Sequence, residues 1–247
     1  MTERPAFFPL YEGVGVDDTQ SFKFAWNPGF AFSQKQKNVL ALHEAIKAKF
    51  PGCRPLEISS KSMEEIGVRL SAFNLSIPYA GGRSSVESVF QASKVFESGG
   101  PFPDLYTRDS REVRDFIRGE DRGRLVAFDA HGVRWGLNPT RAFYDWIYCR
   151  ALSKNPNLVS QLSDFNCFTD IAFNPVRAVN CQAYAVALYL SLKNFGVVDD
   201  ALTSKDKFLK YHPCDVVEQP KTNILKKSNK NQKKKSADNQ VYFEGFL

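Results

Sequence analysis

Residues 84–97 constrain the fold and function of this chain more than any other segment. Read as an α-helix, at about 100° per residue, they place Glu87, Gln91 and Lys94 within about one sixth of the helix circumference. Apolar side chains border this polar column and cover most of the remaining surface: Val86, Val89, Phe90, Ala92, Val95 and Phe96. A carboxylate and an amine among apolar neighbours are either groups tuned for chemistry or the solvated stripe of an ordinary helix. Periodicity alone favours the stripe, so other features have to decide.

The composition indicates a globular protein without a membrane segment. The chain has 247 residues, 43% of them hydrophobic, which is enough to bury a core in one large domain or two small ones. No stretch approaches the roughly 20 apolar residues that span a bilayer. The first residues, Met1–Pro5, lack the basic segment and apolar run of a secretory signal. We therefore expect a soluble, cytoplasmic protein.

The cysteines and histidines do not form a recognisable metal-binding pattern. The five cysteines are scattered and none is spaced as C-x-x-C, and there are three histidines. We expect no metal and no cofactor. A cysteine nucleophile at Cys167 or Cys181 stays open, although no histidine is adjacent to either in the sequence.

The net charge of +6 is concentrated near the C-terminus. Residues 221–235 contain seven lysines and no acid, and without them the net charge would be −1. Such a run, mixed with Asn, Ser and Gln, buries too little apolar surface to fold, so residues 211–247 are predicted to form a disordered tail. The tail is either a solubilising extension or a tether that binds nucleic-acid phosphates without sequence preference.

Local patterns predict a predominantly helical α+β fold with a small β-sheet in a single domain. Residues 1–54 are expected to form an extended arm and a helix packed on the body, residues 55–210 the main domain. The first predicted elements are a helix from a Ser33–Gln36 capping box to Pro51, short strands or extended segments at 56–60 and 70–77, and the helix at 84–97. A hairpin at 124–137 that turns at His131-Gly132 follows, and then helices at 138–153, from 155, and at 176–194. The sequence contains neither a G-x-G-x-x-G motif nor a P-loop, which would indicate a nucleotide-binding α/β fold.

Several motifs in order resemble the NADAR family, the YbiA-like proteins linked to NAD and ADP-ribose chemistry. The most specific is the pattern of Ser85, Glu87, Gln91, Ala92 and Lys94. The weaker ones are Leu70-Ser71-Ala72-Phe73-Asn74, Tyr144-Asp145-Trp146, the loop Phe168–Pro175 and Asn180. The first of these departs from the family pattern, because Ala72 stands where Asn is usual. The resemblance covers about residues 55–195, and the segment Glu57–Ser62 is most similar to the branch paired with DarT-type toxins.

The resemblance implies a function and a set of site residues. DarT-type toxins attach ADP-ribose to guanine in DNA, and the NADAR partner removes it as an antitoxin. Glu87 would be the general acid and Lys94 the nucleophile, which needs a lowered pKa. On one helix the two residues would be about 10 Å apart along the axis, with Gln91 between them. The expected substrate-binding residues are Lys61, Ser71, Asn74, Arg83, Phe90, Gln91, Asp145, Trp146, Asp170 and Asn180.

Two other functions stay open at this point. The same chemistry can act on a small N-glycoside, such as a riboflavin-pathway intermediate. Alternatively, the protein is a non-enzymatic module that binds ADP-ribose or the toxin. The expected partners are ADP-ribosylated DNA and a cognate DarT-like toxin, without a membrane. A binding module has no need of a nucleophile, so the presence of both Glu87 and Lys94 favours an enzyme.

Overall fold

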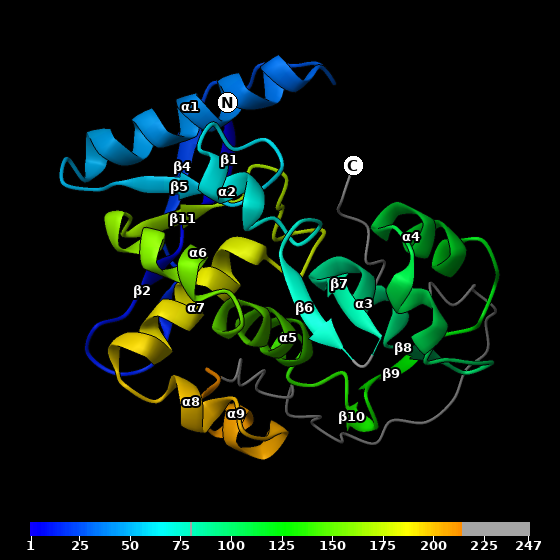
Figure 1. The fold of residues 1–247 in the computed structure, drawn as a ribbon. Helices are drawn as coiled ribbons and strands as arrows, with labels where there is room; N and C mark the ends of the chain where they lie inside the picture. The colour runs from blue at the N-terminus through cyan, green and yellow to red at the C-terminus, as the bar shows by residue number, and fades with distance from the viewer. Residues whose placement is uncertain (80, 214–247) are drawn as a thin grey trace, which may run out of the picture.

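Two central helices organise the molecule. The computed structural model describes residues 1–79 and 81–213. The helices α5 (Ala142–Ser153) and α7 (Gln182–Asn194) make the most extensive contact between any two elements of this part of the chain. Nearly all their residues are buried, because both helices are apolar around most of their circumference. The main hydrophobic core forms around this pair (Figure 1).

The remaining helices cover this pair from several sides. In Figure 1, α1 crosses the top, α3 and α4 lie on the right, and α8 and α9 lie below. Their bounds are α1 Phe32–Lys49, α2 Glu65–Arg69, α3 Val86–Ala92, α4 Ser110–Arg118, α6 Pro156–Gln161, α8 Val198–Ala201 and α9 Lys205–Tyr211, with 3₁₀ turns at Pro103–Thr107 and Leu162–Asp164.

The strands form five small sheets in the described residues. The largest joins β8 (Lys94–Phe96), β9 (Leu125–Ala130) and β10 (Val133–Trp135) in antiparallel order. The other sheets are the antiparallel pairs β1 (Thr2–Pro5) with β4 (Ser21–Phe24), β2 (Phe8–Pro9) with β3 (Val16–Asp17), and β6 (Ser76–Tyr79) with β7 (Gly82–Ser85), and the parallel pair β5 (Pro55–Glu57) with β11 (Cys167–Thr169). The predicted α+β class is confirmed, with several short sheets in place of one.

The N-terminal residues pack against α1. Strands β1 and β4 and helix α1 enclose a second, smaller core that includes Phe22, Leu42 and Ile46. The expected capping box of Ser33 is wrong: α1 begins at Phe32, and the amides of Gln34 and Lys35 bond to the Ala31 carbonyl. The helix does end before Pro51, as predicted.

Of the other local predictions, some are confirmed and some are wrong. The hairpin at residues 124–137 is confirmed, and His131 and Gly132 both take positive φ at its turn. The helix after Asn155 is confirmed, whereas α5 begins four residues later than expected. The expected strand at 70–77 is mostly wrong, because the Ser71 carbonyl accepts bonds from the amides of Asn74 and Leu75 and closes a turn.

The chain stays folded beyond the expected boundary at residue 210. Helix α9 continues to Tyr211, and the His212 side chain is buried. The lysine-rich segment 221–235 lies outside the described residues. No helix in the described part of the chain is long and apolar enough to cross a membrane.

Candidate active site

Helix α3 is shorter than predicted, and Lys94 does not lie on it. The Ser85 hydroxyl caps the helix start by accepting a hydrogen bond from the Ser88 amide at 2.9 Å. The helix ends at Ala92, and Lys94 is the first residue of β8, opposite Phe128 of β9. Local periodicity favours a helix through residue 97, but pairing with a strand some 30 residues later overrides it.

A chain of hydrogen bonds joins the three polar side chains of the predicted column. The Gln91 Nε2 donates to Glu87 Oε1 at 2.9 Å, and Lys94 Nζ donates to Gln91 Oε1 at 2.7 Å. All three are buried, with 1%, 8% and 9% of Glu87, Gln91 and Lys94 exposed. Between these described residues, the amide bridges the two ionisable groups and no direct salt bridge joins Glu87 to Lys94. The column is therefore not a solvated stripe.

Burial shifts the pKa of both groups toward their neutral forms. It raises the pKa of Glu87, although the bond from Gln91 and the charge of Lys94 oppose this shift. It lowers the pKa of Lys94 to about 8. The charge of Glu87 opposes this shift, and the charge of Arg118 adds to it. The Lys94 ammonium also lies over the Phe90 ring, 5.3 Å from its centroid. An acid and an amine with pKa values moved toward neutrality are typical of a catalytic site.

The three side chains open onto one small cavity. It leaves about 30 Å³ of free space, room for a water molecule or two. Its lining residues come from α3, the start of β8, α4, α5 and the loop before α7: Glu87, Phe90, Gln91, Lys94, Arg114, Arg118, Tyr144, Ala178, Val179 and Asn180.

Two buried polar atoms in the cavity lining form no hydrogen bond with any residue that the structure describes. Within residues 1–79 and 81–213, neither the Tyr144 hydroxyl nor Asn180 Oδ1 finds a hydrogen-bond partner, although both are buried. Buried polar atoms normally pair, because leaving one unpaired costs about 1–3 kcal/mol. Both atoms therefore lie in the cavity lining with hydrogen-bonding capacity that the described residues do not use.

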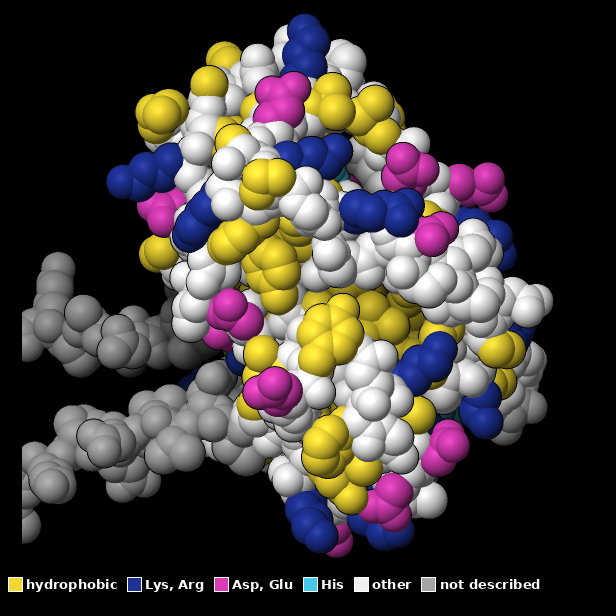
Figure 2. All heavy atoms as spheres, turned by 90° about the vertical axis from the view of Figure 1, so that its left-hand side faces the viewer, with side chains coloured by type: hydrophobic (Ala, Val, Ile, Leu, Met, Phe, Trp, Pro, Cys, Tyr) yellow, Lys and Arg dark blue, Asp and Glu magenta, His cyan; other side chains and the backbone are white. Residues whose placement is uncertain are grey.

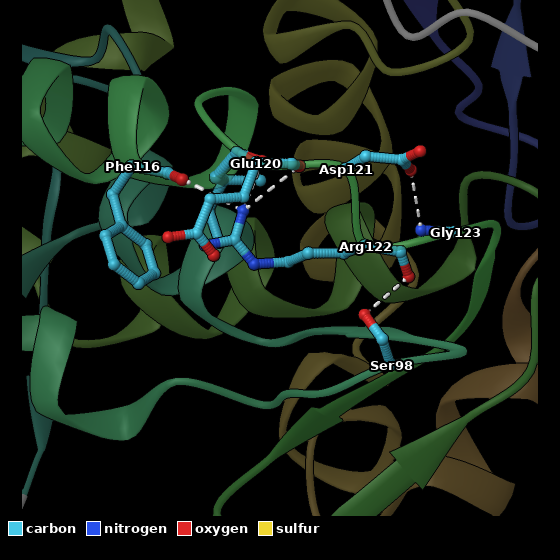
Figure 3. A network of polar contacts seen from close by, with 7 residues as sticks. Ser98, Phe116, Glu120, Asp121, Arg122 and Gly123 are labelled. Atoms are coloured by element: carbon cyan, nitrogen blue, oxygen red, sulfur yellow. Dashed lines mark hydrogen bonds and ion pairs between the residues drawn. The ribbon is translucent and has the colours of Figure 1, made fainter.

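Helix α4 brings Arg114 and Arg118 to the cavity and is fixed at both ends. At its start, the Ser110 and Ser85 hydroxyls are 2.6 Å apart. Beyond its end, Arg122 turns back and donates to the carbonyls of Phe116 at 3.0 Å and Ile117 at 3.1 Å (Figure 3). These bonds satisfy terminal helix carbonyls, and the Arg122 charge complements the helix dipole.

The same arginine ties this helix end to the strand that carries Lys94. Arg122 pairs with Glu120 at 2.9 Å, and its own carbonyl accepts a bond from the Ser98 hydroxyl at 2.9 Å (Figure 3). Ser98 lies two residues after β8. Arg114, Arg118 and Tyr144 are not among the predicted site residues, because nothing local to their segments places them near Glu87.

Asp170 lies in a second buried cluster, together with Glu57. The Glu57 carboxylate accepts bonds from Ser59 at 2.6 Å, Thr169 at 2.7 Å and the Ile171 amide at 2.9 Å. Burial and the nearby Asp170 raise the pKa of Glu57 to about 8, and burial raises the pKa of Asp170 to about 6.

Gln182 connects this acidic cluster to α3. Its Nε2 donates to Asp170 Oδ2 at 3.0 Å, and its Oε1 accepts from the Ala72 amide at 2.8 Å. The Ala72 carbonyl in turn accepts the Glu87 amide at 2.9 Å. Asp170 does not line the cavity. It is connected to the start of α3 through Gln182 and Ala72.

The predicted cations do not line the cavity. Arg83 is exposed and bonds to Ser76 and Asn155, which fastens the β6–β7 hairpin to the start of α6. Lys61 is half-buried, and its ammonium donates to the Ser60 hydroxyl at 2.6 Å. Burial lowers the pKa of Lys61, while the charges of Asp170 and Glu57 oppose the shift.

Ser71 and Asn74 differ in their surroundings. Asn74 is exposed, and its Nδ2 donates to the Val68 carbonyl at 2.8 Å, so its side chain closes the end of α2. The Ser71 hydroxyl is buried and has no hydrogen-bond partner among the residues that the structure describes. Of these two side chains, the Ser71 hydroxyl is the one without a hydrogen bond to the described residues.

The Asp145-Trp146 pair lies in the core on the far side of α5. Asp145 Oδ2 is 2.9 Å from His212 Nε2, and both side chains are buried. Trp146 packs against Trp135, with ring centroids 5.0 Å apart, and Arg150 lies over its ring. Neither Asp145 nor Trp146 contributes to the cavity lining.

The described residues contain neither a metal-binding cluster nor an exposed thiol at the two candidate cysteines. They contain no group of three or more His, Cys, Asp or Glu side chains that could hold a metal ion. Cys167 and Cys181 are buried, and burial raises the pKa of the Cys181 thiol well above its ordinary value, which disfavours a thiolate.

A larger groove lies elsewhere, on the side of β2 and the end of α1. Figure 2 shows apolar side chains gathered around a hollow on this side of the molecule. The groove, of about 640 Å³, includes Phe8, Leu10 and Phe50, and its charged residues are Asp17 and Lys49. Asp17 accepts bonds from Thr19 in a turn, and Lys49 is exposed. Neither of these charged residues is buried, so size alone does not make the groove the active site.

The fold and the site together define an α+β protein with a buried acid and a buried amine at one cavity. A family model described as the DarT1-associated NADAR antitoxin matches residues 2–222. The chain therefore belongs to the NADAR family, in the branch of antitoxins associated with DarT1, and the resemblance seen in its motifs is confirmed. None of the curated proteins matches the chain significantly.

Proposed function

We propose that this antitoxin hydrolyses the N-glycosidic bond between ADP-ribose and guanine in DNA, and so reverses the modification made by a DarT1-like toxin. The Glu87–Gln91–Lys94 chain supports the proposal most directly, because it holds a buried acid and a buried amine at one cavity. The NADAR family is known for N-glycosidase-type activity, which agrees with this chemistry.

In the first step, the bond between C1″ of the ribose and the guanine amine breaks. Neutral Glu87 donates its proton to the leaving nitrogen, which its raised pKa allows near neutral pH. The neutral form of Lys94 forms a bond from Nζ to C1″, and its lowered pKa supplies that form. The proton that Nζ then loses returns to the Glu87 carboxylate.

In the second step, water releases the product. Opening of the ribose ring converts the adduct to a Schiff base, water adds to C1″, and the C1″–Nζ bond breaks to give free ADP-ribose and the amine. Gln91 accepts a hydrogen bond from Lys94 and donates one to Glu87. Through these bonds it keeps the two groups apart, so that a direct ion pair does not hold Lys94 in its charged form.

Arg114 and Arg118 are the cations at the cavity, and we assign the pyrophosphate of ADP-ribose to them. Tyr144 and Asn180 offer a hydroxyl and an amide oxygen for the ribose hydroxyls. Phe90 lines the apolar side. The other predicted substrate contacts stay predictions, although none of them lines the cavity: Lys61, Ser71, Asn74, Arg83, Asp145, Trp146 and Asp170.

The test uses an oligonucleotide with one ADP-ribosyl-guanine. Wild type is expected to release ADP-ribose, and Glu87→Gln and Lys94→Met are expected to lose the activity. Borohydride should trap a covalent adduct in wild type but not in Lys94→Met. A Lys193→Gln variant, altered at an exposed lysine of α7, is the control and should behave as wild type.

Each of the other possible results would indicate a different mechanism or function. Release without a trapped adduct would keep the hydrolase and remove the covalent lysine. If a small nucleotide N-glycoside is cleaved and the oligonucleotide is not, the substrate is a small molecule. Binding of ADP-ribose or toxin without any release would identify a non-enzymatic module.

A further inference from the structure

Two cysteines from distant parts of the sequence meet in the smaller core. Cys53 lies between α1 and β5, and Cys167 is the first residue of β11. Both side chains belong to the core that α1 and the N-terminal strands enclose. The Cys167 thiol donates a hydrogen bond to the Cys53 sulfur, and both cysteines are free thiols. The fold therefore brings two sulfur atoms into contact without a covalent bond between them.

The backbone next to this contact holds the two segments together. Strands β5 and β11 pair in parallel, with Pro55 opposite Cys167. One residue earlier, the Arg54 amide donates to Asn166 Oδ1 at 2.8 Å, and the Asn166 amide donates to the Arg54 carbonyl at 3.3 Å. Cys53 directly precedes these bonded residues. The position of its sulfur relative to Cys167 is therefore set by the start of the β5–β11 pair.

The two thiols differ in their access to solvent. Of the four cysteines in the described residues, Cys53 is 6% exposed, whereas the other three are fully buried. Cys53 also lines the groove of about 640 Å³ beside β2 and the end of α1. A groove of this size can admit a small molecule. A reagent in the groove therefore reaches Cys53 before it reaches Cys167.

The hydrogen bond between the thiols gives them different reactivity. The bond from Cys167 lowers the pKa of the Cys53 thiol; burial opposes this shift, and the charge of Lys47 adds to it. The same bond, together with burial, raises the pKa of the Cys167 thiol. Because a thiolate attacks a disulfide and a thiol does not, Cys53 is the attacking group of the pair. Cys167 is the partner that keeps its proton until a later step.

We propose that Cys53 and Cys167 form a reversible disulfide, and that Cys53 reacts first with a low-molecular-weight disulfide that enters the groove. The Cys53 sulfur bonds to one sulfur of the reagent, the bond within the reagent breaks, and the released thiolate takes up the proton that Cys53 has lost. The Cys167 sulfur then bonds to the Cys53 sulfur and displaces the second half of the reagent, which takes up the Cys167 proton. Both protein thiols are oxidised, and the reagent is reduced to two thiols. An excess of small thiol reverses both steps.

The disulfide would covalently join the two strands that carry the second acidic cluster. Strand β5 ends at Glu57 and β11 ends at Thr169, and the Thr169 hydroxyl donates to the Glu57 carboxylate at 2.7 Å. The new bond would also close a long loop, residues 53–167, and so reduce the entropy of the unfolded chain. Neither cysteine lines the cavity of the candidate active site, so the disulfide does not depend on the proposed reaction.

The test treats the reduced full-length protein with oxidised glutathione and maps the products by mass spectrometry after digestion without reductant. Wild type should give the Cys53–Cys167 pair of peptides, and dithiothreitol should restore both thiols. Cys167→Ala should stop at a glutathione adduct on Cys53. In Cys53→Ala, Cys167 should take up no glutathione. Cys149→Ala, at a fully buried cysteine of α5, is the matched control and should form the same disulfide as wild type.

Other products would overturn the proposal. A stable glutathione adduct on Cys53 of wild type, without a second bond, would show that Cys167 does not resolve it. A disulfide from Cys53 to Cys214, which lies outside the described residues, would assign a different partner. Glutathione on Cys167 in Cys53→Ala would reverse the order of attack. The wild-type digest decides the pairing even where a variant does not fold.

Thermal unfolding measures whether the native fold accommodates the bond. A disulfide that closes a long loop stabilises a protein through its unfolded state, so oxidised wild type should melt about 5–15 °C above the reduced protein. The melting temperature of Cys53→Ala should be the same with and without oxidised glutathione. An equal or lower melting temperature for oxidised wild type would show that the bond strains the native fold, against the proposal.

Discussion

Replacing Gln91 by Met tests the electrostatic design of the site. The substitution keeps a similar volume and removes both bonds of the bridging amide. In wild type the amide oxygen accepts a bond from the Lys94 ammonium at 2.7 Å and so stabilises its charged form. The pKa of Lys94, already lowered to about 8 by burial, should fall further when this acceptor is lost.

The size of the shift follows from the energy of that bond. A hydrogen bond to a charged group contributes about 1.5–3 kcal/mol, which equals about one to two pKa units. The pKa of Lys94 in Gln91→Met is therefore expected at about 6–7. At pH 7.5 the neutral fraction of the amine would rise from about a quarter to most of the population. The pKa of Glu87 should rise further, because the carboxylate loses its amide donor.

The assay follows the Lys94 amine directly and needs no substrate. NMR of the lysine Cε and Nζ signals across pH 5–11 gives its pKa, with Lys94→Arg identifying the signal. Gln161→Met, at an exposed glutamine of α6, is the matched control and should leave the titration unchanged. A pKa that stays at 8 would refute the bridging role. A pKa that rises would show that Glu87 and Lys94 pair directly once the amide is gone.

Three further perturbations test the rest of the structure. The raised pKa values of Glu57 and Asp170 mean that both groups bind protons more tightly in the folded state, so the free energy of unfolding should fall as pH rises from about 5 to 8. Glu57→Gln should flatten this pH dependence in urea titrations, and a pH dependence equal to that of wild type would contradict the prediction. Tyr144→Phe should lower kcat/KM about threefold to tenfold without loss of stability, because its hydroxyl has no partner among the described residues; a clear drop in melting temperature would instead show a structural role. His212→Ala should lower the unfolding free energy by about 1–3 kcal/mol, because the buried Asp145 loses this hydrogen bond, and an unchanged unfolding free energy would show that the contact does not stabilise the fold.

Local sequence patterns predict those elements whose signals are themselves local. The hairpin at 124–137 and the start of α6 at Pro156 follow from turn and capping residues within a few positions of each element. The last long helix shows where such reasoning stops. It was expected from residue 176, but α7 begins at Gln182, because Asn174 forms a separate turn with Arg177 and Ala178.

The three polar residues at the centre of the candidate site could be predicted from one short segment of the sequence. Gln91 lies four residues after Glu87 and three before Lys94. Its hydrogen bonds to both side chains form even though the helix ends at Ala92. Short-range geometry fixes such contacts, so they can be inferred from one segment. The motif around them was also sufficient to indicate the family, which the match over residues 2–222 confirms.

The residues around these three could not be predicted locally, because they depend on how distant elements pack. Arg114 and Arg118 reach the cavity because α4 packs beside α3, and Tyr144 reaches it because α5 lies beneath. The same packing turns Asp145 toward His212, 67 residues away in the sequence. Burial, which moves the pKa values of Glu87 and Lys94 toward neutrality, is likewise a property of the assembled elements, since no single segment can remove its own side chains from water.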